Sequence, residues 1–100
     1  MSQISFQEVN IMKSVITVIG EDAVGIIAKV SGLLAKTNIN IIDISQTTYD
    51  KQFLMVMVVD IKEASASFYE ISEKLKNLGE ENGLKIQVRH KKVFDTMHRI

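Results

Sequence analysis

Apolar and polar residues follow two different periods along this chain, and the periods predict an order of strands and helices. Residues 14–19 form a β-branched run closed by Gly20, which is typical of a buried strand. Further on, apolar residues recur at intervals of three and four, which predicts an amphipathic helix ending at Thr37-Asn38. These apolar residues are Ile26, Ile27, Val30, Leu33 and Leu34.

The second half of the chain repeats the same kind of order. Residues 39–49 and 52–61 are expected to form two strands, joined by a short hairpin at Asp50-Lys51 that lacks the usual glycine. A second amphipathic helix is predicted to start near Ser65 or Ser67. Its apolar positions are Phe68, Ile71, Leu75 and Leu78, and residues 84–90 then alternate as a last strand.

Two strand–helix–strand halves around a central hairpin predict an α+β protein with the ferredoxin-like βαββαβ plait. In this plait a four-stranded antiparallel sheet carries two helices on one face. One hundred residues allow one domain with one core. We expect that domain to span residues 13–92, after a flexible N-terminal extension (1–12) and before a C-terminal segment (93–100).

The third predicted strand is apolar on both of its faces. Residues 53, 55, 57, 59 and 61 point one way and residues 54, 56 and 58 the other, although a sheet with one covered face should alternate apolar with polar. The second face must therefore be covered by another body. Either a second copy of the chain covers it, which we favour, or the C-terminal segment folds back through Val93, Phe94, Met97 and Ile100.

Composition removes several classes of function. Twelve Lys and Arg balance twelve Asp and Glu, so the chain lacks the positive field that binds nucleic acid. No apolar stretch is long enough to cross a membrane. The absence of cysteine excludes disulfides and thiolate metal sites. The N-terminus also lacks a basic segment followed by an apolar run, so we expect the protein in the cytoplasm.

The turn between the first strand and the first helix carries the most informative chemistry. A helix start offers unpaired N–H groups to an anion, and Gly25 has no side chain to obstruct a close approach. Glu21 and Asp22 lie beside it, so a ligand with an ammonium group next to its carboxylate suits both signs of charge. In the alternative interpretation, Asp22 is an N-cap, Glu21 is solvated and Gly25 only permits packing.

Other residues give weaker signals. The spacing G-x-x-x-x-G matches the outer glycines of a phosphate-binding loop, but Ile26 and Ile27 replace its Lys-Ser/Thr. His90 and His98 are expected at the surface, without the convergent ligands that a metal needs. Asp43, between two isoleucines, is either exposed at an edge or orients a bound ammonium group. No cofactor and no catalytic set are predicted.

Taken together, the Gly-Glu-Asp strand end, the Val-Gly-Ile-Ile-Ala-Lys-Val helix start and the Asn-Ile-Asn-Ile run at 38–41 resemble the ACT-domain pattern. The resemblance is closest to the small stand-alone proteins similar to the glycine-cleavage repressor. It implies an effector bound at the interface of two ACT domains. By position, the implied ligand-binding residues are Asp22, Ala23, Val24, Gly25, Ile26 and Asn40.

Two functions follow from these patterns. The first is a non-catalytic regulatory module that binds a small molecule, expected to be an amino acid, as a homodimer. The second is a structural or protein-interaction module that dimerises, or binds a partner protein, without a ligand. The serine-responsive ACT domains have an effector-binding side chain where this chain has Gly20, so the resemblance leaves the ligand's identity open.

Overall fold

The structure of the protein is a computed structural model that describes residues 13–21 and 24–97. The predicted order of strands and helices is confirmed, with one further helix at the C-terminal end. The elements are β1 (Lys13–Gly20), α2 (Ile26–Lys36), β2 (Asn40–Tyr49), β3 (Gln52–Asp60), α3 (Phe68–Glu81), β4 (Lys85–His90) and α4 (Lys91–Met97). The N-terminal extension predicted over 1–12 lies outside the described residues.

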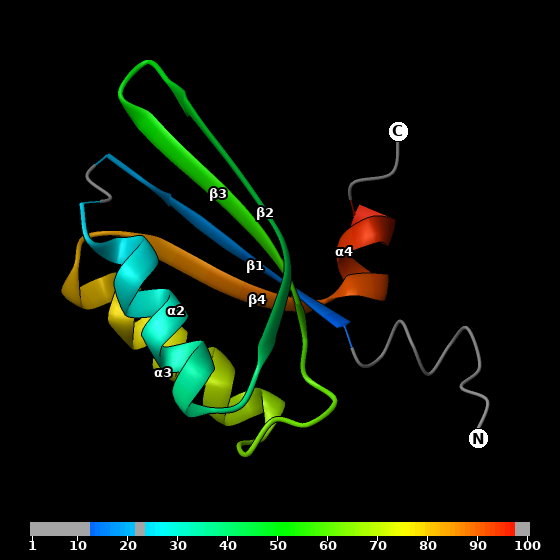
Figure 1. The fold of residues 1–100 in the computed structure, drawn as a ribbon. Helices are drawn as coiled ribbons and strands as arrows, with labels where there is room; N and C mark the ends of the chain where they lie inside the picture. The colour runs from blue at the N-terminus through cyan, green and yellow to red at the C-terminus, as the bar shows by residue number, and fades with distance from the viewer. Residues whose placement is uncertain (1–12, 22–23, 98–100) are drawn as a thin grey trace.

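The four strands form one antiparallel sheet in the order β2-β3-β1-β4, as the ferredoxin-like plait requires. Helices α2 and α3 cover one face of this sheet, and α4 lies on its other side (Figure 1). The order leaves β2 and β4 as the two edge strands. None of the helices in the described part of the chain is long and apolar enough to cross a membrane.

The core lies between the two central strands and the helices α2 and α3. Alternate residues of β1 and β3 point toward the helices, and Ile16, Met55 and Met57 are fully buried there. Helix α2 contributes Ile26, Val30 and Leu34 to this core, and α3 contributes Ile71 and Leu75. The intervals of three and four in the sequence therefore mark the buried faces of the two helices.

Each helix end is fixed by a local signal. At the start of α3, the Ser67 hydroxyl oxygen accepts a hydrogen bond of 3.1 Å from the Glu70 N–H, which identifies Ser67 rather than Ser65 as the N-cap. At the end of α2, Asn38 takes a left-handed backbone conformation with φ of 58°. The chain can then leave the helix and enter β2 directly.

The β2–β3 hairpin turns at Asp50 and Lys51, as predicted. Both residues have positive φ, 48° and 69°, which is the conformation that a two-residue turn of the I′ type demands. Glycine is the residue usually found there, so Lys51 is held in a left-handed conformation that its side chain disfavours. The hairpin extends beyond the helix layer (Figure 1).

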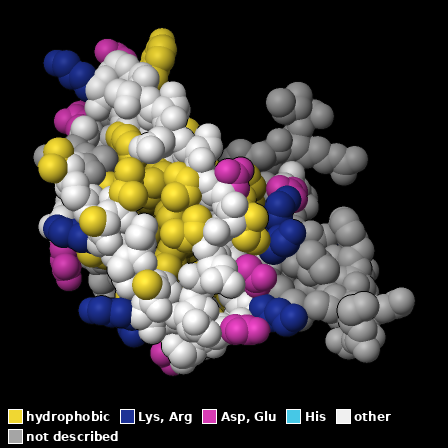
Figure 2. All heavy atoms as spheres, viewed as in Figure 1, with side chains coloured by type: hydrophobic (Ala, Val, Ile, Leu, Met, Phe, Trp, Pro, Cys, Tyr) yellow, Lys and Arg dark blue, Asp and Glu magenta, His cyan; other side chains and the backbone are white. Residues whose placement is uncertain are grey.

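The second face of the sheet is covered in part by the C-terminal segment. Helix α4 contacts β1 and β4, and Val15, which points away from α2 and α3, is only 2% exposed. Ile19 and Leu54, which are paired across β1 and β3, remain 42% and 37% exposed on the same face. Figure 2 shows hydrophobic side chains gathered over the strands, with most charged side chains around them.

Replacing Ser67 by alanine removes the N-cap of α3 and should destabilise the protein by about 1 kcal/mol. Replacing Ser65, which is exposed and contributes only its backbone N–H to a hydrogen bond with the Thr37 carbonyl oxygen, should change stability by less than about 0.5 kcal/mol. Urea unfolding of the two variants measures the difference. Equal losses for both would contradict the assignment of the cap.

Replacing Lys51 by glycine should stabilise the protein by about 0.5 to 1 kcal/mol, because glycine adopts positive φ without the steric cost that lysine bears. The matched control is Lys51→Ala, which removes the same charge but keeps a Cβ, and it should give no gain. Thermal unfolding of both variants tests this. A gain in the alanine variant would attribute the effect to the lysine side chain instead of the backbone.

Candidate functional site

Helix α2 begins at a glycine, which has no side chain to cap it. Its N-cap residue is Gly25, which makes no side-chain hydrogen bond, and the first turn contains no acidic residue. The first intrahelical bond that follows runs from the Lys29 N–H to the Gly25 carbonyl oxygen at 3.1 Å. The first turn of a helix has N–H groups without intrahelical partners, and the helix dipole adds positive potential at this end.

Gly25 is required for its backbone conformation. Its φ is 76°, in the left-handed region, while a Cβ added at this position would meet no atom within 4 Å. The same open space means that nothing in the described chain covers the residue. The beginning of α2 is therefore accessible to a ligand or to another molecule.

The predicted site residues near Gly25 have different positions. Asp22 and Ala23 lie outside the described residues, so their predicted roles are not tested. Val24 is 91% exposed beside Gly25. Ile26 is 1% exposed and packs in the core, so its side chain is not accessible to a ligand and only its N–H faces the helix start.

Asn40 lies at the other end of α2. It is exposed and begins β2. Two hydrogen bonds hold the segment just before it. The Ile39 N–H donates to the Leu34 carbonyl oxygen (2.9 Å), and the Asn38 side-chain amide donates to the Glu63 carbonyl oxygen (3.0 Å). A helix of 11 residues is about 16 Å long at its usual rise. Gly25 and Asn40 are thus not brought together within one chain (Figure 1).

A residue that the sequence did not reveal lies beside Asn40. Asp60 pairs with Asn40 across β2 and β3, and its carboxylate accepts a hydrogen bond of 2.8 Å from the Lys62 N–H. A register shift between Ile41 and Asp43 produces this pairing, since regular counting from the hairpin would place Ile61 opposite Asn40. No pattern in the sequence marks the shift.

The remaining candidate residues do not form a second site with these. Asp43 is exposed on β2, at the edge of the sheet. His90 is half-buried rather than at the surface, because its ring stacks on Phe68 with 4.1 Å between the centroids. His98 lies outside the described residues. The described part of the chain holds no cluster of three or more metal-ligating side chains of His, Cys, Asp or Glu.

Two grooves among the described residues lie elsewhere, one between α3 and β4 and one between α2 and α3. Neither includes Val24, Gly25 or Asn40. Within a single chain, Gly25 and Asn40 thus lie exposed at opposite ends of α2, and neither of these two grooves joins them.

The sheet order, the two helices on one face and the open, glycine-capped helix start define a small domain of the ferredoxin-like class with a ligand-accessible first turn. The model of the ACT domain family matches residues 13–89. The chain belongs to the ACT domain family, whose members are typically regulatory domains that bind ligands. The resemblance drawn from the sequence motifs is thereby confirmed.

Relatives of the same size support this assignment. A protein of the UPF0237 group from Methanocaldococcus jannaschii is 46% identical over 86 residues, which cover 86% of this chain and 96% of that protein. An ACT domain protein from Streptococcus pneumoniae superimposes with a TM-score of 0.73 at 38% identity, covering 84% of this chain and 94% of that one.

A more distant structure shares the fold alone. A glycine cleavage system transcriptional repressor-like protein superimposes with a TM-score of 0.68 at 15% identity. The superposition covers 77% of this chain and 45% of that protein.

Proposed function

We propose that the protein is a non-catalytic regulatory module of the cytoplasm that binds a free amino acid between two copies of the chain. The observation that carries the proposal is the glycine at the start of α2, where a Cβ would meet no described atom within 4 Å and the helix dipole offers positive potential to a carboxylate. Asn40 at the beginning of β2 and Asp60, which pairs with it at the end of β3, supply an amide and a carboxylate that suit an ammonium group. A zwitterion therefore matches the two parts of the site.

The separation of these two parts supports a dimer. Along β2, which is an edge strand, every residue is exposed, including Ile41, Ile42 and Ile44. An exposed apolar edge strand readily pairs with another strand. In an antiparallel pair of β2 strands, Asn40 of each copy moves toward the end of the sheet where α2 of the other copy begins.

The length of α2 suggests the register of this pairing. A helix of about 16 Å corresponds to about five residues of a strand. Asn40 of one copy therefore reaches toward the level of Gly25 in the other when residues 40–44 pair with themselves, centred on Ile42. This is the apolar half of β2, whereas residues 46–49 are polar or aromatic. The register that completes the ligand site is thus the one that buries the isoleucines.

The dimer can be tested with single cysteines, because the natural chain has none. Ile42→Cys lies next to the expected two-fold axis and should form a disulfide-linked dimer under mild oxidation, since paired strands bring Cα atoms within disulfide range. Thr47→Cys, equally exposed on β2 but away from the axis, is the matched control and should stay monomeric on a non-reducing gel. Equal cross-linking of both variants would contradict this register.

The ligand can be tested by differential scanning fluorimetry of the protein with each free amino acid. A ligand at one hundred times its Kd stabilises the folded state by about 2.7 kcal/mol, so the effector should raise Tm by several degrees. Asn40→Ala should remove the shift, and Thr47→Ala on the same strand should keep it. If no amino acid shifts Tm while Ile42→Cys still cross-links, the protein acts as an interaction module without a ligand.

A further inference from the structure

The outer edge of β4 is unpaired in the described chain. β4 pairs with β1 on one side, and the strand order of the sheet ends there. In an antiparallel sheet, alternate residues of an edge strand direct their N–H and C=O groups outward. Such an edge can accept an extended segment of another chain as an additional strand.

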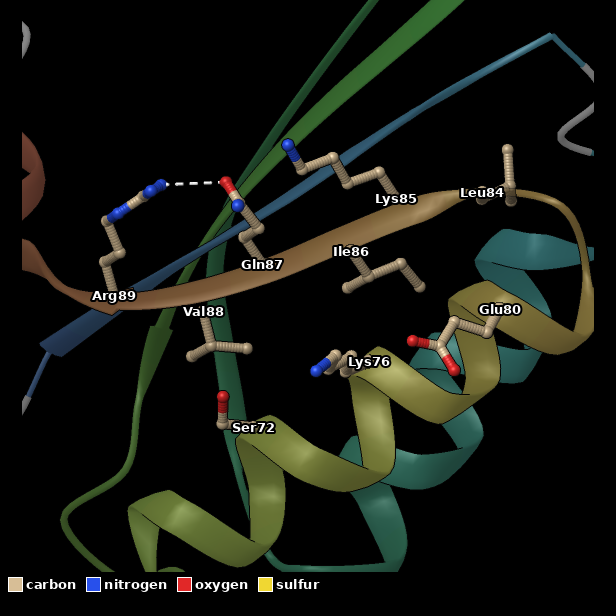
Figure 3. A pocket seen from close by; sticks show the side chains of 9 residues that line it. All are labelled: Ser72, Lys76, Glu80, Leu84, Lys85, Ile86, Gln87, Val88 and Arg89. Atoms are coloured by element: carbon tan, nitrogen blue, oxygen red, sulfur yellow. Dashed lines mark hydrogen bonds between the residues drawn. The ribbon is translucent and has the colours of Figure 1, made fainter.

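A groove of about 510 Å³ runs along this edge, between β4 and α3 (Figure 3). Ser72, Lys76 and Glu80 of α3 line one wall, and β4 itself lines the other. Ile86 and Val88 point from β4 toward α3, whereas Lys85, Gln87 and Arg89 point away from it. An added strand would consequently meet apolar side chains on one face and basic side chains on the other.

The charged side chains beside the β4 edge are predominantly basic. Lys76, Lys85 and Arg89 line the groove with one acidic residue, Glu80. The Arg89 guanidinium donates a hydrogen bond of 3.0 Å from Nη1 to Oε1 of Gln87, which orients it on the face of the strand (Figure 3). Its other N–H groups can bind a carboxylate in bidentate fashion. No ion pair joins these three basic side chains to another described residue.

We propose that the groove between β4 and α3 binds an extended acidic segment of a partner protein as a fifth strand of the sheet. The segment carries acidic side chains opposite Lys85 and Arg89, hence four residues apart, because opposite charges directly across a strand pair attract. The residues between them alternate, with apolar side chains on the face of Ile86 and Val88. Main-chain hydrogen bonds supply affinity, and the two acidic positions supply specificity.

A second copy of the chain is a poor occupant of the same edge. Antiparallel self-pairing along all of β4 centres on Gln87, and it would place Lys85 of each copy opposite Arg89 of the other. Like charges directly opposite each other destabilise a strand pair. The edge formed by β2 has no such barrier, since its only charged residue is Asp43.

The proposal can be tested with a labelled peptide, acetyl-Ser-Glu-Val-Thr-Val-Glu-Ser-amide, added to the full chain. We expect saturable binding in fluorescence anisotropy, and amide NMR shifts on residues 85–90 that are absent from residues 40–49. N-methylation of the three central peptide residues removes donors needed for strand pairing and should abolish binding. Shifts confined to β2, or no saturable binding, would overturn the proposal.

Charge reversal gives a matched comparison. The double variant Lys85→Glu with Arg89→Glu should bind the peptide at least about tenfold more weakly, and should prefer the peptide in which both glutamates are lysine. Lys51→Glu with Lys62→Glu makes the same charge change at exposed positions elsewhere and should bind like the natural chain. Equal weakening in both double variants would mean that Lys85 and Arg89 do not recognise the acidic positions of the peptide. Self-association of the natural chain through β4 would likewise overturn the proposal, because a second copy would then occupy the edge.

Discussion

The structure depends on the contact between the two central strands and the helix pair on one face of the sheet. Ile16 and Val18 of β1 and Met55 and Met57 of β3 are fully buried against α2 and α3, and burial of apolar area is the main source of folding free energy. In the order β2-β3-β1-β4, β1 and β3 are the inner strands and pair on both sides. Among the described strands, only β2 and β4 therefore have a free edge. The two proposed binding surfaces are these two edges, at β2 and at β4.

The register shift in β2 connects the core with the candidate site. It places Ile41 and Ile44 opposite Val59 and Met57, two buried residues of the helix-covered face, although Ile41 and Ile44 are three positions apart. A regular strand brings only even spacings to one face, so the shift lets both isoleucines lie on that side. The same shift brings Asp60 beside Asn40. In the proposed site, this local irregularity supplies the carboxylate.

The sequence predicted the order of elements well because periods of two and of three to four are direct consequences of strand and helix geometry. It did not predict α4 as a helix, since seven residues with no cap signal carry little periodicity. It also did not predict the pairing of Asn40 with Asp60, which depends on one extra residue in β2. The motif glycine was found correctly, but the distance from Gly25 to Asn40 depends on the length of α2 and became evident only in three dimensions.

The two edges of the sheet have opposite chemistry, and this bears on how one small domain can serve two partners. The edge at β2 carries three isoleucines and one charged residue, Asp43, and in the proposed dimer it pairs with its own copy. The edge at β4 carries Lys85 and Arg89 and repels its own copy. β1 and β3 lie between the two edges, so occupation of one leaves the other sterically open. A dimer formed through β2 thus still presents two β4 grooves, and a partner with two acidic segments would gain affinity by binding both at once.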